Sequence, residues 1–306
     1  MGFKIISHIL RTLLGLVYIY SAYTKFYSID EFELFIFGNG IPNWDIATSF
    51  ARVLISAELF LGVLLLINIY TKKILQINLL VLILFTILLA YLSIFASDIS
   101  NCNCFGEHLE FTPLESLLKN IALIAITIFL LFYKFPFSFK FKKILMILIL
   151  ISAFSAPTIL SPPDYIYPES YKKLDRPLDY SLLKDFNKNS EGKSVEKEKT
   201  LICFFGTHCK FCKLAAKKIT IIEKNINLDF PIFYVFWGKE ADLNQFWEET
   251  ESKKYPYLFL TTSDFFKLSG GSLPSINFID NGIIKGQTGF RNLNQGEIED
   301  FFKPIN

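Results

Sequence analysis

The stretch that decides the fold of the second half of this chain runs from Thr200 to Cys212 and reads TLICFFGTHCKFC. Its first six residues, apolar apart from Thr200, are expected to form a buried strand. A short turn, Gly206 to His208, leads into Cys209-Lys210-Phe211-Cys212, which opens the amphipathic run Lys213 to Ile222. The pattern therefore predicts a cysteine pair at the start of a helix that directly follows a buried strand.

The residues after this helix continue to alternate between strand and helix patterns. In order they are the strand Phe230 to Trp237, the helix Ala241 to Thr250, the short strand Tyr257 to Leu260, the strand Ile276 to Ile279, the hairpin turn Asp280-Asn281-Gly282, the strand Ile283 to Gly286 and the closing helix Asn294 to Phe302. This order resembles a thioredoxin fold. The resemblance implies an α/β thioredoxin-like domain over residues 200–306, in which Pro274 has the place of the cis-proline that faces the dithiol.

Cys209 and Cys212 have the spacing that thiol-disulfide exchange needs. At a helix start, the first cysteine is exposed and the second lies behind it, close enough to resolve a mixed disulfide. The helix dipole and its unpaired amides should stabilise a Cys209 thiolate, and His208 and Lys210 should add to this. The usual Trp before the first cysteine is His208 here, which bears on the redox potential.

Two other interpretations of the cysteines in this region were weighed. Half of a zinc site is less favoured, because no second cysteine pair or paired histidines accompany the motif in the domain. Cys203 points from a core strand and is expected to be a small buried apolar thiol.

The first half of the chain has a different texture. Hydrophobic residues make up 52% of the 306 residues, and most of the long apolar runs precede Ser161. A membrane-spanning helix takes about 20 apolar residues. Five stretches qualify: Ile5 to Tyr23, Ala47 to Ile69, Leu75 to Ala96, Leu117 to Tyr133 and Ile144 to Leu160. The sequence predicts an all-α bundle of four or five transmembrane helices over residues 1–160, a linker over 161–199 beginning at Ser161-Pro162-Pro163, and the thioredoxin-like domain over 200–306.

The charged residues that flank these spans predict their orientation, since short cytoplasmic loops are rich in Lys and Arg. The turn after the second span carries Lys72 and Lys73, whereas the connections after the first and third are acidic. The amino terminus should therefore be cytoplasmic and everything beyond Leu160 periplasmic, in the inner membrane of a bacterium. The first span lacks a clear signal-peptide cleavage site and is followed by Lys25, so we expect it to be retained.

Three ionisable residues lie at membrane depth: Arg11, Arg52 and Glu58. Because such residues are costly in hydrocarbon, they usually face the bundle interior and find a partner. An Arg11–Glu58 pair is feasible. It could belong to a proton- or quinone-linked site, or it could be a buried pair that fixes helix packing.

A second cysteine pair lies in the connection between the third and fourth spans, which reads NCNCFGEH from Asn101 to His108. A bond between Cys102 and Cys104 would need a tight local turn, and strained or exposed disulfides tend to be oxidising. The pair could therefore accept electrons from Cys209 and Cys212. The alternatives are a metal site that includes His108, for copper for example, and a static loop staple.

The membrane half also resembles the MauE/DoxX-like membrane family over residues 3–160. The resemblance rests on the Cys-x-Cys-Phe-Gly segment, on the region around Arg11-Thr12-Leu13-Leu14-Gly15 and Lys25, and on Glu58-Leu59-Phe60-Leu61-Gly62. It implies a four- or five-helix bundle linked to disulfide chemistry or to the maturation of exported proteins. By analogy, the arrangement is functionally similar to quinone-linked membrane thiol oxidases of the VKOR and DsbB type.

Together these patterns predict a membrane-anchored thiol-disulfide oxidoreductase that acts on exported, cysteine-containing proteins, with a quinone as the candidate acceptor and no covalently bound cofactor. A net charge of +2 argues against nucleic-acid binding. All five cysteines are expected on the outer side, so the chain alone should not carry electrons from the cytosol by thiols. The alternative function is a membrane assembly factor or scaffold, whose outer domain binds a client or a metal without turnover.

Overall fold

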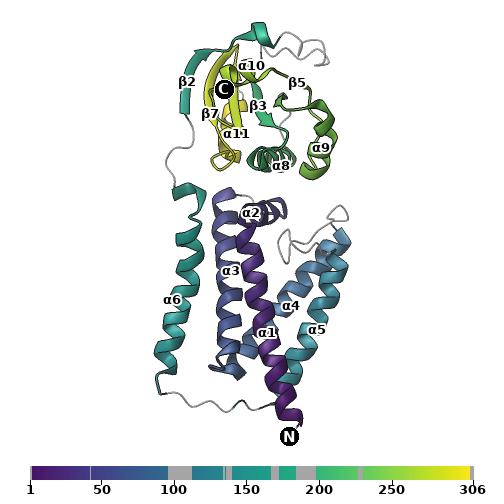
Figure 1. The fold of residues 1–306 in the computed structure, drawn as a ribbon, viewed down its shortest axis with the longest axis vertical. Coiled ribbons are helices and arrows are strands. Elements are labelled where there is room, and N and C mark those ends of the chain that lie inside the picture. Colours follow the sequence, from purple (N-terminus) through teal and green to yellow (C-terminus); the bar gives the residue numbers. More distant parts are fainter. Residues whose placement is uncertain are drawn as a thin grey trace. The chain divides into compact units, whose positions relative to one another are not determined.

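The structure is a computed structural model, and it describes residues 2–41, 43–95, 112–133, 135, 140–166, 172–183, 198–226 and 230–303. The chain divides into two compact units (Figure 1). The first holds Met1–Ile36 and Thr48–Pro162, and the second holds Phe37–Ala47 and Pro163–Asn306. Each unit is described by itself below.

The first unit is built from helices. They are α1 (Gly2–Tyr27), α2 (Ile29–Gly38), α3 (Trp44–Leu66), α4 (Thr71–Phe95), α5 (Pro113–Leu131) and α6 (Lys142–Leu160). All of these except α2 are long and apolar enough to cross a membrane, which confirms the five predicted spans. Helix α2 was not predicted, because at ten residues it is too short to span and its charged first turn disguises the apolar residues that follow.

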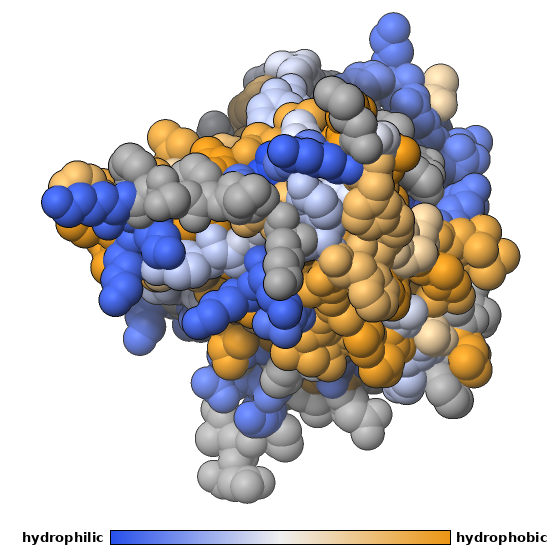
Figure 2. Space-filling model, turned by 90° about the horizontal axis from the view of Figure 1, so that it is seen from below, coloured by the Kyte–Doolittle hydropathy of each residue, from blue (hydrophilic) through white to orange (hydrophobic). Residues whose placement is uncertain are grey.

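The core of this unit is formed where four helices meet. Leu14 and Tyr18 of α1 pack with Leu64 of α3, Leu75 of α4 and Leu130 of α5. The opposite sides of the helices carry exposed Leu, Ile and Phe side chains, and hydrophobic residues cover much of the face seen in Figure 2. In water such surfaces would be costly, so they fit helices that are solvated by lipid.

Helices α1 and α3 approach each other closely at two glycines. A Cβ atom on Gly15 would lie 2.9 Å from the carbonyl oxygen of Gly62, and one on Gly62 would lie 2.8 Å from the carbonyl oxygen of Gly15. Small residues allow such close backbone packing between membrane helices. The two glycines therefore fix the crossing point of α1 and α3.

The second unit is a mixed sheet flanked by helices. Its strands are β2 (Lys172–Pro177), β3 (Thr200–Gly206), β4 (Ile232–Trp237), β5 (Tyr257–Phe259), β6 (Ser275–Asp280) and β7 (Ile283–Thr288). Its longer helices are α8 (Lys210–Asn225), α9 (Leu243–Thr250), α10 (Thr262–Ser269) and α11 (Gln295–Phe302). Short 3-10 helices occur at Asp164–Ile166, Tyr180–Leu182 and Glu240–Asp242.

The strand order confirms the thioredoxin-like fold. The six strands lie in the order β2-β7-β6-β3-β4-β5. Strand β3 pairs in parallel with β4 and antiparallel with β6, and β6 forms a hairpin with β7. A right-handed crossover through a helix is the usual link between parallel neighbours, and α8 supplies it between β3 and β4.

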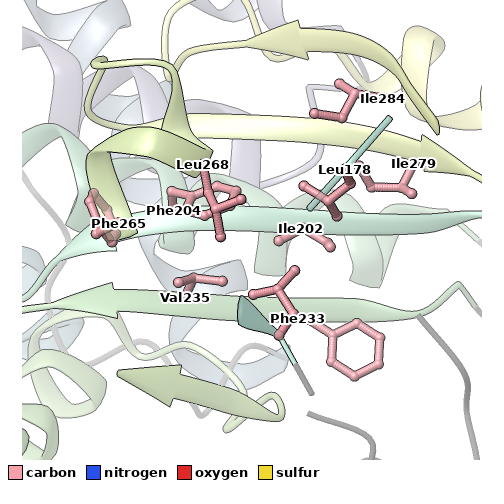
Figure 3. Close-up of a cluster of buried hydrophobic side chains, with 10 residues drawn as sticks. Leu178, Ile202, Phe204, Phe233, Val235, Phe265, Leu268, Ile279 and Ile284 are labelled. Atoms are coloured by element: carbon pink, nitrogen blue, oxygen red, sulfur yellow. The ribbon is translucent and has the colours of Figure 1, made fainter. Parts of the chain in front are cut away.

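Apolar side chains fill both faces of this sheet. Ile202 and Phe204 of β3 pack with Phe265 and Leu268 of α10 on one face (Figure 3). The next residue along β3, Phe205, contacts the ring of Phe246 of α9 at a centroid distance of 6.1 Å. Because neighbouring side chains on a strand point to opposite faces, β3 is buried on both sides and reads as a continuous apolar run.

Two parts of the second unit differ from the sequence-based expectation. The predicted linker, residues 161–199, contains strand β2, which pairs antiparallel with β7 at the sheet edge. The polar sequence KKLDRP does not resemble a buried strand, because a strand at the edge of a sheet is partly exposed. Exposed and partly buried residues indeed alternate along the end of β2. Helix α10 was also missed. It begins at a Thr261 cap, whose hydroxyl accepts a hydrogen bond from the Asp264 amide.

Candidate active site

Cys209 lies at the amino-terminal cap of helix α8. Its backbone is extended, with φ −78° and ψ 115°, and its sulfur accepts a hydrogen bond from the amide of Cys212 at 3.3 Å. The first amides of a helix lack partners within the helix, so a side chain at this position is surrounded by donors. The thiol of Cys209 is half-buried and remains accessible.

This position lowers the pKa of the Cys209 thiol from 9.0 to about 7. The largest cause is the hydrogen bond from the side chain of Cys212, and the amides of Cys212 and Phe211 and the charge of Lys213 act in the same direction. A pKa near 7 makes roughly half of the thiol a thiolate at neutral pH. The thiolate form of Cys209 is thus populated at neutral pH.

Cys212 has the opposite environment. Its side chain is fully buried in the first turn of α8, and its sulfur accepts a hydrogen bond from the Gly206 amide at 3.4 Å. Burial, and then the neighbouring Cys209, raise the pKa of the Cys212 thiol well above its usual range. The two cysteines therefore differ in exposure and acidity as the helix-start spacing predicts.

Side chains from three elements meet around Gly206 at the end of β3. A Cβ atom on Gly206 would lie 3.3 Å from Cβ of Cys209, 3.6 Å from Trp237 and 3.9 Å from Leu273. The Leu273–Pro274 peptide bond is cis, as the thioredoxin resemblance implies for Pro274. Trp237 is partly exposed and was not singled out from the sequence, although it ends a strand parallel to β3 and so had to lie near the motif.

Other charged residues near Cys209 are arranged differently from the prediction. The Nε2 atom of His208 lies 2.9 Å from a carboxylate oxygen of Asp242, so this ring is held beside an acidic partner. Lys210 is exposed. The cation that lowers the pKa of Cys209 is instead Lys213, one turn into α8, which also forms an ion pair with Glu249 of α9. The spacing of four residues from Cys209 could have indicated Lys213.

Cys203 is a buried thiol on β3. Its side chain has no exposure, and burial raises the pKa of the Cys203 thiol well above its usual value. The expectation of a small buried thiol is therefore confirmed.

The membrane residues pair differently from the expectation. Arg11 does not contact Glu58. Its guanidinium donates hydrogen bonds to the backbone carbonyls of Leu65 and Leu66, at the carboxyl end of α3. Glu58 binds the ammonium of Lys25 at 2.6 Å. The sequence did not indicate Lys25 as a partner because this lysine lies near the end of its span, where a lysine usually turns toward water.

Arg52, a third buried cation among the described residues of the bundle, also has partners. It forms an ion pair with Glu33 of α2, and its Nε donates to the carbonyl oxygen of Ser161 at 2.9 Å. The second cysteine pair, Cys102 and Cys104, and the neighbouring His108 lie outside the described residues. Within the described ranges, no group of three His, Cys, Asp or Glu side chains is placed to hold a metal ion.

Comparison with known proteins gives results for both halves of the chain. Residues 3–133 match the family of the methylamine utilisation protein MauE. Over 90% of its length, the chain is 27% identical to Protein TlpB of Flavobacterium psychrophilum, of which the alignment covers 89%.

Among solved structures, the chain is similar to the thioredoxin domain of a thiol-disulfide oxidoreductase from Bacteroides vulgatus, with 19% identity over 40% of this chain and 84% of that one, and a TM-score of 0.31. It is also similar to StoA of Bacillus subtilis, with 12% identity over 44% of this chain and 97% of that one, and a TM-score of 0.31. The chain thus joins a MauE-like membrane half to a thioredoxin-like domain, whose fold follows from its own strand order.

Proposed function

We propose that the chain is a membrane-anchored thiol-disulfide oxidoreductase that exchanges disulfides with exported, cysteine-containing proteins. The observation that carries this proposal is the contrast within one turn of α8. Cys209 is accessible and has a pKa of about 7, whereas Cys212 is buried and its thiol is far less acidic. An exposed nucleophile with a resolving thiol behind it is the arrangement that dithiol exchange requires.

In the oxidising direction, a client thiolate attacks the Cys209 sulfur of the Cys209–Cys212 disulfide. The bond to Cys212 breaks, and a mixed disulfide joins the client to Cys209. A second client thiolate then attacks the client sulfur of this bond, and Cys209 leaves as a thiolate. The client gains a disulfide, and Cys209 and Cys212 keep the two electrons as a dithiol. The reducing direction reverses these steps.

We assign the thioredoxin-like domain to the outer side of a bacterial inner membrane. The reason is the charge of the connections between spans. Lys72 and Lys73 follow α3, and Lys140, Lys142 and Lys143 precede or begin α6, which favours a cytoplasmic place for both connections. With five spans, the amino terminus is then cytoplasmic and the domain after α6 is periplasmic. Client proteins would be met after export.

The domain needs a route by which its dithiol is reoxidised. We propose that Cys102 and Cys104 accept the two electrons from Cys209 and Cys212 and pass them on to a membrane quinone. Replacing both loop cysteines by serine should then leave Cys209 and Cys212 reduced in cells. An unchanged redox state would remove the loop from the mechanism while leaving thiol exchange at Cys209 intact.

The central experiment is to trap clients through Cys209. In a Cys212→Ser variant, Cys209 can still attack a client disulfide, but no Cys212 thiol remains to release the client. Exported proteins should then be recovered covalently attached, and mass spectrometry of the reduced complexes would name them. The Cys209→Ser/Cys212→Ser double variant should trap none, and Cys203→Ala should behave as the unmodified chain because Cys203 is buried. A scaffold that binds clients without turnover would keep its cellular function in Cys209→Ser, and that result would reject the proposal.

A further inference from the structure

We propose that Trp44 is a positioning residue for thiol exchange, because it holds Phe290 and Arg291 against Phe211, which lies between the two cysteines of the motif. The position of the Phe211 ring is argued from contacts within the second unit. Its consequence for clients rests on the proposed function of Cys209.

Trp44 is part of the core of the second unit. The residues Phe37–Ala47 belong to this unit, although they include the end of α2 and the first turn of α3. Trp44 is only 3% exposed, and its indole N–H donates to a carboxylate oxygen of the buried Asp164 at 3.0 Å. The other oxygen of Asp164 accepts from the guanidinium of Arg291 at 2.9 Å. Trp44 and Arg291 are therefore joined through one buried carboxylate.

The ring of Trp44 also covers a buried lysine of α8. The ammonium of Lys218 lies 3.5 Å from the centroid of this ring, and Lys218 has no exposed surface. The ammonium donates to the carbonyl oxygens of Phe290 and Arg291, at 3.0 Å and 3.4 Å. The attraction between a cation and an aromatic face is strongest when both are removed from water. Lys218 thus fastens the backbone of residues 290–291 to α8 beneath the Trp44 ring.

These contacts continue along α8 to Phe211. Phe211 and Lys218 are seven residues apart, which is about two turns, so they lie on the same side of the helix. The centroid of the buried Phe290 ring lies 5.9 Å from that of Trp44 and 6.1 Å from that of Phe211. The guanidinium of Arg291 lies 5.7 Å from the Phe211 ring. A buried tryptophan is therefore connected, through two residues, to a ring that is 41% exposed.

The exposed ring of Phe211 is part of the surface that a client would meet at Cys209. A side chain that is already held in place loses less conformational entropy when a partner binds. Holding Phe211 should therefore favour large clients and matter little to a small disulfide. The pKa of the Cys209 thiol should not depend on Trp44, because the groups that lower it all lie in α8.

The first test reads the position of Phe211 without thiol exchange. 4-Fluorophenylalanine is placed at position 211 of the full chain, in detergent micelles and a Cys209→Ser background, and its fluorine NMR signal is recorded. Trp44→Leu should move the signal, and Lys218→Met should move it in the same direction because the same backbone is released. Trp44→Phe keeps a ring over Lys218 and should restore the signal. If Trp44→Leu does not fold, Lys218→Met decides.

The second test compares a large and a small disulfide substrate in the full chain with both cysteines present. Dithiothreitol serves as the reductant, insulin as the large substrate and 2-hydroxyethyl disulfide as the small one. Trp44→Leu should raise KM for insulin roughly fivefold without lowering kcat, because an aromatic contact that prepares the binding surface is lost. The rate with 2-hydroxyethyl disulfide should stay unchanged. Trp44→Phe should restore the KM for insulin.

The matched control is Trp247→Leu. Trp247 is a second buried tryptophan of the same unit, but it packs on Tyr234 and Phe236. This variant should leave the fluorine signal in place. A signal that stays fixed in Trp44→Leu and Lys218→Met, or that moves equally far in the control, would overturn the proposal, as would equal losses with the two disulfides. If the unmodified chain reduced neither disulfide, the proposed function would fail, whereas the fluorine signal would still decide whether Trp44 positions Phe211.

Discussion

The carboxyl end of α3 and the amino end of α8 both present backbone groups without partners inside the helix, and opposite charges meet them. At α3 the guanidinium of Arg11 binds the carbonyls of Leu65 and Leu66. At α8 the sulfur of Cys209 accepts from the Cys212 amide. Each charge has the sign that the helix dipole favours at that end.

The two helix ends differ in how accessible the charged group is to other molecules. Arg11 is buried within the bundle, and both of its bonds go to backbone, so its charge holds α1 to α3. Cys209 is half-buried, and its sulfur can be reached from outside. The same physical effect therefore holds two helices together at one site and lowers the pKa of an accessible thiol at the other. Exposure decides which of the two results.

The largest effect expected from this contrast is the pH dependence of the alkylation rate of Cys209. Because its pKa is about 7, the thiolate fraction should rise roughly ninetyfold between pH 5 and pH 8, and alkylation by iodoacetamide should follow it. Peptide mass spectrometry of the reduced full chain would give the rate. Arg11→Met should show the same profile. A midpoint near 9 would mean that the end of α8 does not activate the thiol.

A smaller effect is expected on stability when Arg11 is replaced. Arg11→Met leaves the carbonyls of Leu65 and Leu66 without this donor in a buried place, which should cost about 1–3 kcal/mol of unfolding free energy. Denaturant unfolding in micelles would measure it. Arg11→Lys should recover part of the loss, because one cation still reaches the helix end. Full stability in Arg11→Met would show that the contact does not hold α1 to α3.

The smallest effect expected is the shift in the pKa of the Cys209 thiol when a nearby charge is removed. Lys213 lowers the pKa of Cys209 and pairs with Glu249. Lys213→Met should therefore move the alkylation midpoint to higher pH. Glu249→Gln frees the lysine from its partner and should move the midpoint to lower pH. Shifts of the same sign in both variants would contradict the assignment of Lys213 as the modulating cation.

The two units also differ in how much of them could be predicted. The spans were found because lipid demands long apolar helices, a signal that needs no tertiary context. The strands β3, β4 and β6 were found because buried strands are largely apolar runs, and β7 was found because the hairpin turn Asp280-Asn281-Gly282 precedes it. Strand β2 was taken for linker because an edge strand is polar on one side, and α10 was missed because its eight residues follow β5 with only a Thr261 cap to mark them.

The candidate sites divide in the same way. The helix-start position and spacing of Cys209 and Cys212 predicted one exposed and one buried cysteine, because a helix fixes where residues three apart must point. The membrane pairing went wrong because Lys25, near the end of its span, was passed over in favour of Arg11. Pairing across helices depends on how the helices cross, which no local pattern records.

By itself the sequence determined that this protein has five apolar helices and a dithiol at the start of an α8 that follows a buried strand, since both follow from local periodicity and spacing. Only the tertiary structure decided which charges meet. The contact of Gly15 with Gly62 sets the crossing of α1 and α3, and that crossing brings Glu58 to Lys25 and Arg11 to the end of α3. Side chains reach only a few ångströms, so the packing of whole helices selects their partners.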